Sequence, residues 1–279
     1  MMRRTALLLV IILAASPLGA ADLQAGLNAY ALGDYDVAYR EWQALADQGD
    51  ARAQYNLGTL YTRGRGVAAD DTEAFRWYRM AAAQGYDIAQ FTVGVCYATG
   101  RGVGRDDREA VIWYRKAADQ GKAMAQANLG LMLENGQGVE RDLDAAADYY
   151  RRAAMQGNAA AQFNLGSLYQ RGVGLPHNDF KAVQWYSYAA EQGFALAQYN
   201  LGIMYERGLG VDRDAEMAAS WFMKAARNGD ADAQYRIGEL YADGVGVSQD
   251  REQALYWLNR AAQKGIPGAQ QKIAGMTTP

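Results

Sequence analysis

One segment of about 36 residues recurs along nearly the whole chain. A glycine and a glutamine each return at a constant step, within stretches such as AQYNLG and AQFNLG. The glycines are Gly58, Gly94, Gly130, Gly166, Gly202 and Gly238, and the glutamines are Gln54, Gln90, Gln126, Gln162, Gln198, Gln234 and Gln270. A fixed period of roughly 20 to 50 residues is typical of solenoids, in which each repeat buries its apolar face only against its neighbours. The period therefore predicts a stack of similar units.

Each repeat begins with a helix that ends in a glycine-rich loop. In the repeat that starts at Ala51, Leu57, Leu60 and Tyr61 fall on one helical face, which is the spacing of an amphipathic helix. The sequence GRGV follows, and its glycines can adopt the positive φ that ends a helix.

A second helix completes each repeat. Asp70 is predicted to be its N-cap and Glu73, three residues later, to complete a capping box. The equivalent caps are Asp106, Asp142, Asn178, Asp214 and Asp250. A buried stripe is expected at Ala74, Trp77, Tyr78, Ala81 and Ala82. Gly58 is expected to be small so that the two helices can approach closely.

The combined pattern AxAQYNLGxLYxxGxGVxxDxxxAxxWYxxAAxQG resembles the Sel-1-like repeat, a relative of the tetratricopeptide repeat. The resemblance covers about 250 residues. It implies an all-α fold, a right-handed α/α superhelix of antiparallel helix pairs. It also implies a protein-interaction role, usually without catalysis.

Four segments are expected. Residues 1–21 form a signal peptide, and residues 22–49 form a degenerate capping repeat in which YALGDYDVAYREW has a shorter turn. Residues 50–265 hold six repeats, and residues 266–279 form a capping helix from about Pro267 and a tail. Atypical ends of this kind cover the open faces of a solenoid.

The first residues are typical of a bacterial export signal. Arg3 and Arg4 precede a short apolar run from Ala6 to Ala15, and Gly19-Ala20-Ala21 fits a small-x-small cleavage site. The run is too short for an ordinary membrane span. We expect a periplasmic or secreted protein that is not an integral membrane protein after cleavage, the alternative being an uncleaved N-terminal anchor.

The charge of the mature chain argues against two classes of partner. The chain has 28 basic and 31 acidic side chains, so loss of Arg3 and Arg4 leaves a net charge of −5. A net negative chain is a poor match for nucleic acid or for an anionic membrane surface.

The sequence offers no group of residues suited to catalysis. Cys96 is the only cysteine and His177 the only histidine, so neither an intramolecular disulfide nor a zinc site of the usual kind can form. Loops such as RGRGV lack a P-loop lysine and follow a helix rather than a strand. We therefore expect no catalytic residues, no metal and no cofactor. The tryptophans that recur at the position of Trp77 are expected in the core.

Two rows of residues are predicted on the first helices, which line the concave groove in tetratricopeptide-like folds. The polar row consists of Asn56, Asn128, Asn164 and Asn200, with Thr92 and Arg236 in the remaining repeats. The aromatic row consists of Tyr55, Phe91, Phe163, Tyr199 and Tyr235, interrupted by Ala127. Asparagine is a poor helix former, so its return in mid-helix needs a cause.

Each row has two interpretations. The amides can hydrogen-bond the backbone of an extended peptide, or they can link adjacent repeats. The rings can contact a ligand, or they can pack between neighbouring first helices. Charges also suggest a polarised groove, with basic Arg52, Arg63, Arg171 and Arg207 in the earlier repeats and acidic Asp232, Glu239 and Asp243 in the last.

The sequence thus predicts an exported, monomeric, non-enzymatic scaffold or adaptor that binds a protein or peptide in its groove. Exported members of the Sel-1-like family, which this chain resembles, include envelope adaptors, regulators and virulence-associated interaction proteins. One alternative is a β-lactam-binding or weakly hydrolysing enzyme like the cysteine-rich secreted relatives, although this chain lacks their cysteine pairs. Another is a glycan- or peptidoglycan-binding module, which requires exposed ring faces.

Overall fold

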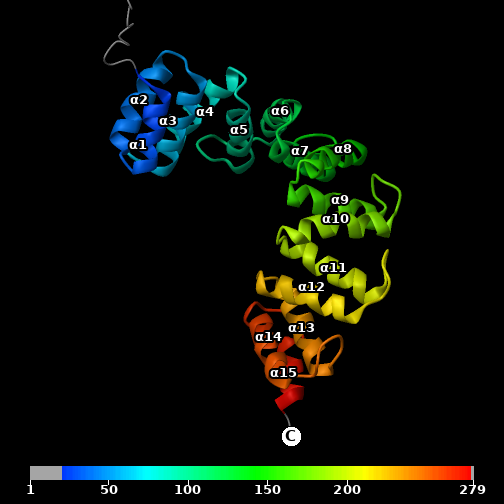
Figure 1. Cartoon of the computed structure of the whole chain (residues 1–279). Helices are drawn as coiled ribbons and strands as arrows, with labels where there is room; N and C mark the ends of the chain where they lie inside the picture. The colour runs from blue at the N-terminus through cyan, green and yellow to red at the C-terminus, as the bar shows by residue number, and fades with distance from the viewer. Residues whose placement is uncertain (1–20, 278–279) are drawn as a thin grey trace, which may run out of the picture. The chain divides into compact units, whose positions relative to one another are not determined.

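The computed structural model describes residues 21–277. The expected signal peptide lies outside the described residues except for Ala21, as do Thr278 and Pro279 of the tail. Every regular element between residues 21 and 277 is an α-helix, and the helices follow one another in pairs (Figure 1). The prediction of an all-α repeat fold is confirmed.

The helices are distributed over two compact units. Among the described residues, the first unit runs as far as Ala89 and includes Arg101–Val103, and the second comprises Gln90–Gly100 and the residues from Gly104 onward. The boundary falls within α5 (Asp87–Thr99). The first unit holds α1 (Leu23–Leu32), α2 (Tyr35–Asp47), α3 (Ala51–Arg63) and α4 (Asp71–Ala83). The second unit holds α6 (Asp107–Asp119), α7 (Ala123–Asn135), α8 (Leu143–Met155), α9 (Ala159–Arg171), α10 (Asp179–Glu191), α11 (Ala195–Arg207), α12 (Ala215–Arg227), α13 (Ala231–Asp243), α14 (Arg251–Gln263) and α15 (Ala269–Thr277).

The odd-numbered helices α3 to α13 are the first helices of the six repeats, and the even-numbered helices α4 to α14 are the second helices. The predicted N-caps are confirmed, because Asp70 and its equivalents accept backbone N–H groups at the start of each second helix. The capping box is only half formed. Glu73 pairs with Arg76, and the N–H of Asp70 is occupied by the carbonyl of Tyr61.

Gly58 and its equivalents let the two helices of a repeat touch. A Cβ on Gly58 would lie 2.5 Å from the ring of Tyr78, and one on Gly166 would lie 2.8 Å from the ring of Tyr186. These distances are far below van der Waals contact, so the expected close approach is confirmed.

The loop glycines join consecutive repeats. Gly64 has φ 60° and caps α3, and Gly66 has φ 70°. A Cβ on Gly66 would lie 2.7 Å from the carbonyl oxygen of Tyr35, the first residue of α2. The same approach recurs in the second unit, where Gly138 meets Asp107 and Gly210 meets Asp179. The second glycine of each loop thus rests on the start of the preceding second helix.

The core follows the predicted stripes. Leu57 and Leu60 are fully buried, and Tyr61 is half-buried. In α4 all five residues of the expected stripe are buried, and Trp42 of the capping repeat is buried as well. Helix α15 begins at Ala269, slightly later than expected, because Gly268 precedes it with φ 84°.

Candidate partner-binding face

The first helices of neighbouring repeats lie side by side within the second unit. Arg171 of α9 pairs with Glu134 of α7 at 3.0 Å, and Arg236 of α13 pairs with Glu206 of α11. The outward side of these helices, α7, α9, α11 and α13, is called here the first-helix face. The predicted polar and aromatic rows lie along it from Ala127 and Asn128 onward, and their earlier members lie on α3 and α5.

The recurring glutamine of each first helix points away from this face into the core. In α9, Gln162 Nε2 donates to the carbonyl of Ala154 at the end of α8, and its Oε1 accepts from Gln192 at the end of α10 at 2.7 Å. The same pair of bonds holds Gln126 and Gln198. The glutamine therefore ties the C-terminal ends of two successive second helices together.

Sequence reasoning used the glutamine only to measure the period and missed this function. The available signal was a second recurring amide 30 residues later, at Gln84, Gln120, Gln156, Gln192 and Asn228. In the last repeat Lys264 replaces that amide and donates to the carbonyl of Gly229 instead. The Oε1 of Gln234 is consequently without a hydrogen-bond partner among the described residues.

The four asparagines of the polar row are half-buried. Burial raises the pKa of the Tyr114 hydroxyl to about 12, while a hydrogen bond from Asn128 acts in the opposite direction. Burial likewise raises the pKa of Tyr150, again opposed by a hydrogen bond from Asn164. Each of these amides therefore contacts the second helix of the preceding repeat.

Arg236 occupies the same position where the preceding ring lacks a hydroxyl. The ring before it is Phe222, and the Arg236 guanidinium lies 6.0 Å from the ring centroid. Arg236 pairs with Glu206 and, at 2.7 Å, with Glu239. Glu134 stands at the same repeat position as Glu206, in the repeat of α7 and α8. It instead accepts a hydrogen bond from the Tyr150 hydroxyl at 2.9 Å. Arg236 thus pairs with carboxylates beside a phenylalanine, whereas Asn128 and Asn164 lie beside a tyrosine hydroxyl.

The rings of the aromatic row are half-buried and rest on other rings. Phe163 lies 5.6 Å from Tyr186 of the same repeat and 5.3 Å from Phe194, which precedes the next first helix. Tyr55, Phe91 and Tyr199 pair in the same way with Tyr78, Tyr114 and Phe222, at 5.3 to 5.8 Å. Because these rings are half-buried and tilted against other rings, they are not the fully exposed ring faces that the glycan alternative requires.

The exposed apolar residues of the first-helix face lie beside these rows. Met124 and Leu131 of α7 are 48% and 45% exposed, and Leu196 of α11 is 50% exposed. Met124 and Leu131 are separated by Ala127, where the aromatic row is interrupted. The face therefore has an uncovered apolar region on α7.

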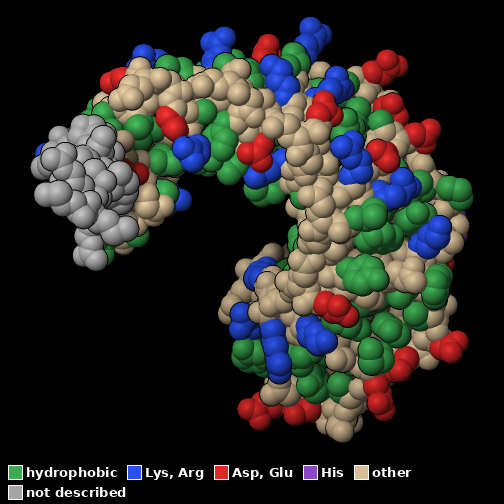
Figure 2. Space-filling model, turned by 45° about the horizontal axis from the view of Figure 1, so that its top comes forward, with side chains coloured by type: hydrophobic (Ala, Val, Ile, Leu, Met, Phe, Trp, Pro, Cys, Tyr) green, Lys and Arg blue, Asp and Glu red, His purple; other side chains and the backbone are tan. Residues whose placement is uncertain are grey.

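The expected charge polarity is weakened by pairing. Glu239 is paired with Arg236, and Asp243 with Lys272 at 3.2 Å. Asp232 is exposed, and it raises the pKa of Tyr199 together with burial, the larger cause. Acidic and basic side chains are interspersed over the side of the molecule drawn in Figure 2.

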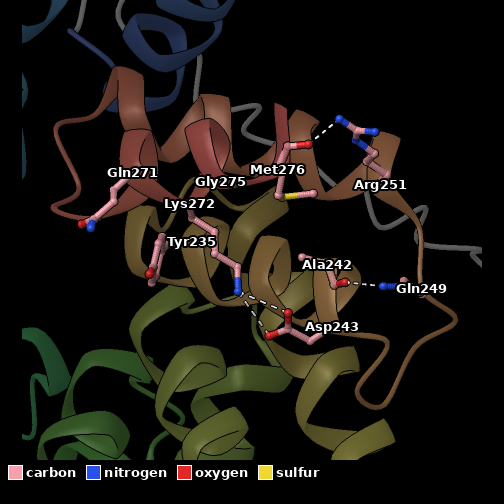
Figure 3. Close-up of a pocket in the computed structure, with 10 residues that line it drawn as sticks. Tyr235, Ala242, Asp243, Gln249, Arg251, Gln271, Lys272, Gly275 and Met276 are labelled. Atoms are coloured by element: carbon pink, nitrogen blue, oxygen red, sulfur yellow. Dashed lines mark hydrogen bonds and ion pairs between the residues drawn. The ribbon is translucent and has the colours of Figure 1, made fainter. Parts of the chain in front are cut away.

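A pocket of about 680 Å³ interrupts the face between α13 and α15. Lys272 lies at the next step of the polar row and points across the pocket to Asp243, while Arg251 donates to the carbonyl of Met276 (Figure 3). Tyr235, the last ring of the aromatic row, also lines it. The capping helix thus closes the face at this end through an ion pair.

The repeats match a known family model. The Sel1 repeat is found at residues 51–86, 87–122, 123–158, 159–194, 195–230 and 231–266. This chain belongs to the Sel1 repeat family. No curated protein matches the chain.

Two solved structures are similar over most of the chain. One is a protective antigen of uropathogenic Escherichia coli described as having an SLR fold, with 40% identity and a TM-score of 0.80 over 83% of this chain and 50% of that chain. The chain thus spans half the length of that antigen. The other is a Sel1 repeat protein from Oxalobacter formigenes, with 34% identity and a TM-score of 0.79 over 87% of this chain and 97% of that one.

His177 is 59% exposed in its side chain and lies 3.2 Å from Asp179. Cys96 is buried in the core, as expected. Residues 21–277 hold no cluster of His, Cys, Asp and Glu suited to a metal. None of the helices described there is long and apolar enough to span a bilayer.

Proposed function

We propose that this Sel1 repeat protein is an exported, non-enzymatic scaffold that binds a protein or extended peptide on its first-helix face. Sel1 repeat proteins are generally protein-interaction scaffolds. The observation that carries the proposal is the uncovered apolar region of Met124 and Leu131, which lies on the same helix as Asn128. Exposed apolar side chains rimmed by polar groups are typical of protein-binding surfaces.

The partner is held by two kinds of contact. Its apolar side chains cover Met124, Leu131 and Leu196, and its backbone meets the free positions of Asn128 and Asn164. An amide has two N–H donors and one carbonyl acceptor, so an asparagine that donates once to a tyrosine hydroxyl can still bond a peptide unit. The partner is an envelope protein, because the sequence of residues 1–21 is that of an export signal.

Site-specific photo-crosslinking tests the face. A photoreactive residue at Leu131 is compared with one at Ile112, because both side chains are 45% exposed but Ile112 lies on the second helix α6. A partner adduct is expected from position 131 and none from position 112. Equal adducts from both positions, or none from position 131, would contradict the proposal.

Export is tested separately by sequencing the N-terminus of protein recovered from the cell envelope. The mature chain is expected to begin at Ala21 or Asp22. Recovery of an intact Met1 would show that the leader is retained.

A further inference from the structure

Helix α10 differs from the other second helices at two exposed positions. Its Phe180 is 60% exposed and its Tyr188 is 53% exposed. With Gln184 between them, they follow one face of the helix at steps of four residues. The other second helices carry Thr72, Arg108, Asp144, Glu216 and Glu252 at the first position, and Met80, Lys116, Arg152, Lys224 and Arg260 at the second. Two aromatic rings are thus exposed where most repeats have a charge.

Helices α8 and α12 lie on either side of α10 and run parallel to it. At the N-terminal ends, Gly174 before α10 approaches the start of α8 at Leu143, and Gly210 before α12 approaches the start of α10 at Asp179. At the C-terminal ends, Gln162 bonds both α8 and α10. There Asn228 after α12 also donates to the carbonyl of Gly193 after α10 at 3.2 Å.

The three helices form a surface of nine exposed residues, called here the α8–α12 block. Its N-terminal row is Asp144, Phe180 and Glu216, its middle row is Asp148, Gln184 and Ser220, and its C-terminal row is Arg152, Tyr188 and Lys224. Acids near the N-terminus and bases near the C-terminus also stabilise each helix through its dipole, so the charges alone indicate no interface. Helix α10 gives up both charges and exposes two rings, which the dipole does not explain.

We propose that the α8–α12 block binds a second copy of itself around a two-fold axis. The axis lies in the plane of the interface and crosses the three helices at right angles, at the level of Gln184. The two α10 helices then lie antiparallel, and Phe180 faces Tyr188 of the second copy. Asp144 faces Arg152 of the second copy, and Glu216 faces its Lys224. This arrangement is isologous, since each contact occurs twice.

The signs of the charges in the two outer rows select this axis and this occupant. In the middle row Asp148 faces its own counterpart on the axis, which is the one like-charge contact of the arrangement. A two-fold axis parallel to α10 would place the acidic row over the acidic row of the other copy. On one side the pattern ends at α6, where Arg108 and Lys116 are both basic and would repel their counterparts. On the other side α14 keeps the order, with Glu252 and Arg260 at the same two positions. An unrelated partner would need charged, aromatic and charged residues in the same order as α8, α10 and α12, whereas a second copy of the block supplies that order by symmetry.

The size of the block sets the strength expected. Three helices, each about 10 Å wide and about 12 Å long over the eight-residue span, cover about 400 Å² per copy. An interface of about 800 Å² in total falls in the weak class, so we expect a dissociation constant of roughly 1 µM to 1 mM. The sequence-based expectation of a monomer makes the opposite prediction.

Sedimentation velocity of the purified protein across this concentration range tests the proposal. The wild type is expected to move from monomer to dimer, and Phe180→Ser with Tyr188→Ser is expected to weaken the dimer at least tenfold. Ile112→Ser on α6 removes a similarly exposed apolar residue outside the block and should change nothing. A wild type that stays monomeric, or a double variant that dimerises normally, would overturn the proposal.

Charge reversal tests the antiparallel geometry. One variant carries Arg152→Glu and Lys224→Glu, and the other carries Asp144→Lys and Glu216→Lys. Each alone presents like charges to itself and is expected to be monomeric, while an equimolar mixture is expected to form a heterodimer. Self-association of either variant at wild-type strength, or a mixture that stays monomeric while the wild type dimerises, would overturn it.

The matched control concerns the ring beneath Lys224. Lys224 lies 3.7 Å from the Trp221 centroid, and Lys116 lies 3.9 Å from the Trp113 centroid on α6. Lys116→Glu loses the same cation–π contact outside the block, so it should leave the dimer unchanged. These measurements need no partner of the first-helix face, so they succeed or fail independently of the proposed function.

Discussion

Two rows of amides run along opposite sides of the first helices, and they differ in burial and in constancy. The glutamine row is at most 6% exposed in all six repeats. The asparagine row is half-buried, and Thr92 and Arg236 replace the amide in two repeats. The glutamine satisfies two helix ends at once, whereas the asparagine lowers the pKa of one tyrosine hydroxyl in two of the repeats.

The difference shows that recurrence at a fixed period does not by itself identify a binding residue. A buried amide with two bonds is fixed by the stacking of the repeats, because losing either bond leaves a buried polar group unsatisfied. Gln270 supports this view, since it lies in α15, beyond the last second helix, and is exposed. The half-buried amide can change identity from repeat to repeat and retains bonding capacity for a partner.

The largest expected effect comes from breaking the glutamine row. Gln162→Leu removes two hydrogen bonds, one to the carbonyl of Ala154 and one from the amide of Gln192. The carbonyl still accepts from Gly157, and the exposed Gln192 amide still donates to the carbonyl of Tyr188. We expect a loss of about 1–3 kcal/mol in the free energy of unfolding, since each of the two lost hydrogen bonds contributes about 0.5–1.5 kcal/mol. Urea unfolding measures it. Gln263→Ala, at an exposed position of α14, is the control and should stay within about 0.5 kcal/mol.

The next effect concerns the asparagine row. Asn128→Ala with Asn164→Ala removes the two amides that act on the hydroxyls of Tyr114 and Tyr150. We expect the free energy of unfolding to fall by about 1–3 kcal/mol in total, at roughly 0.5–1.5 kcal/mol per bond. If the amides also hold a partner, crosslinking from Leu131 should weaken about five- to a hundred-fold. Unchanged crosslinking would show that the asparagine row links adjacent repeats and does not bind the partner.

A smaller effect tests the match between the polar row and the ring beneath it. Arg236→Asn should destabilise the protein because Glu206 and Glu239 lose their partner. Adding Phe222→Tyr then introduces a ring hydroxyl at this position. In the repeat of α7 and α8, the equivalent Tyr150 hydroxyl interacts with Glu134 and Asn164. We expect a favourable coupling of about 0.5–1.5 kcal/mol in a double-mutant cycle of urea unfolding. Additive effects would show that the two positions are independent.

Most of the fold could be predicted from the sequence because the same pattern of residues recurs in six repeats. The second-helix caps, the close contact at Gly58 and the buried stripe of α4 were each specified by local chemistry. The division of contacts between Gln162 and Asn164 could not be predicted, because both are amides of one helix and only the stacking decides which one is enclosed. The exposed rings of α10 likewise gain meaning only beside the charges of α8 and α12.

The smallest expected effect is a shift in the titration of one tyrosine. The pKa of Tyr114 is raised by burial from 10.0 to about 12, and the hydrogen bond from Asn128 lowers it. A hydroxyl whose folded pKa is raised contributes stability that is complete below about pH 10 and is lost as the pH rises through about 12. Because an N–H donor stabilises the phenolate, Asn128→Ala should raise the pKa of Tyr114 further and extend its alkaline limit upward. NMR titration of labelled tyrosine, assigned with Tyr114→Phe, measures the shift.

Asn200→Ala is the control, because the Tyr186 hydroxyl donates to Gln170 at 2.8 Å and its pKa of about 12 has no contribution from Asn200. A downward shift at Tyr114, or an equal shift at Tyr186 in the control, would show that Asn128 does not donate to this hydroxyl and would separate the asparagine row from the repeat junctions.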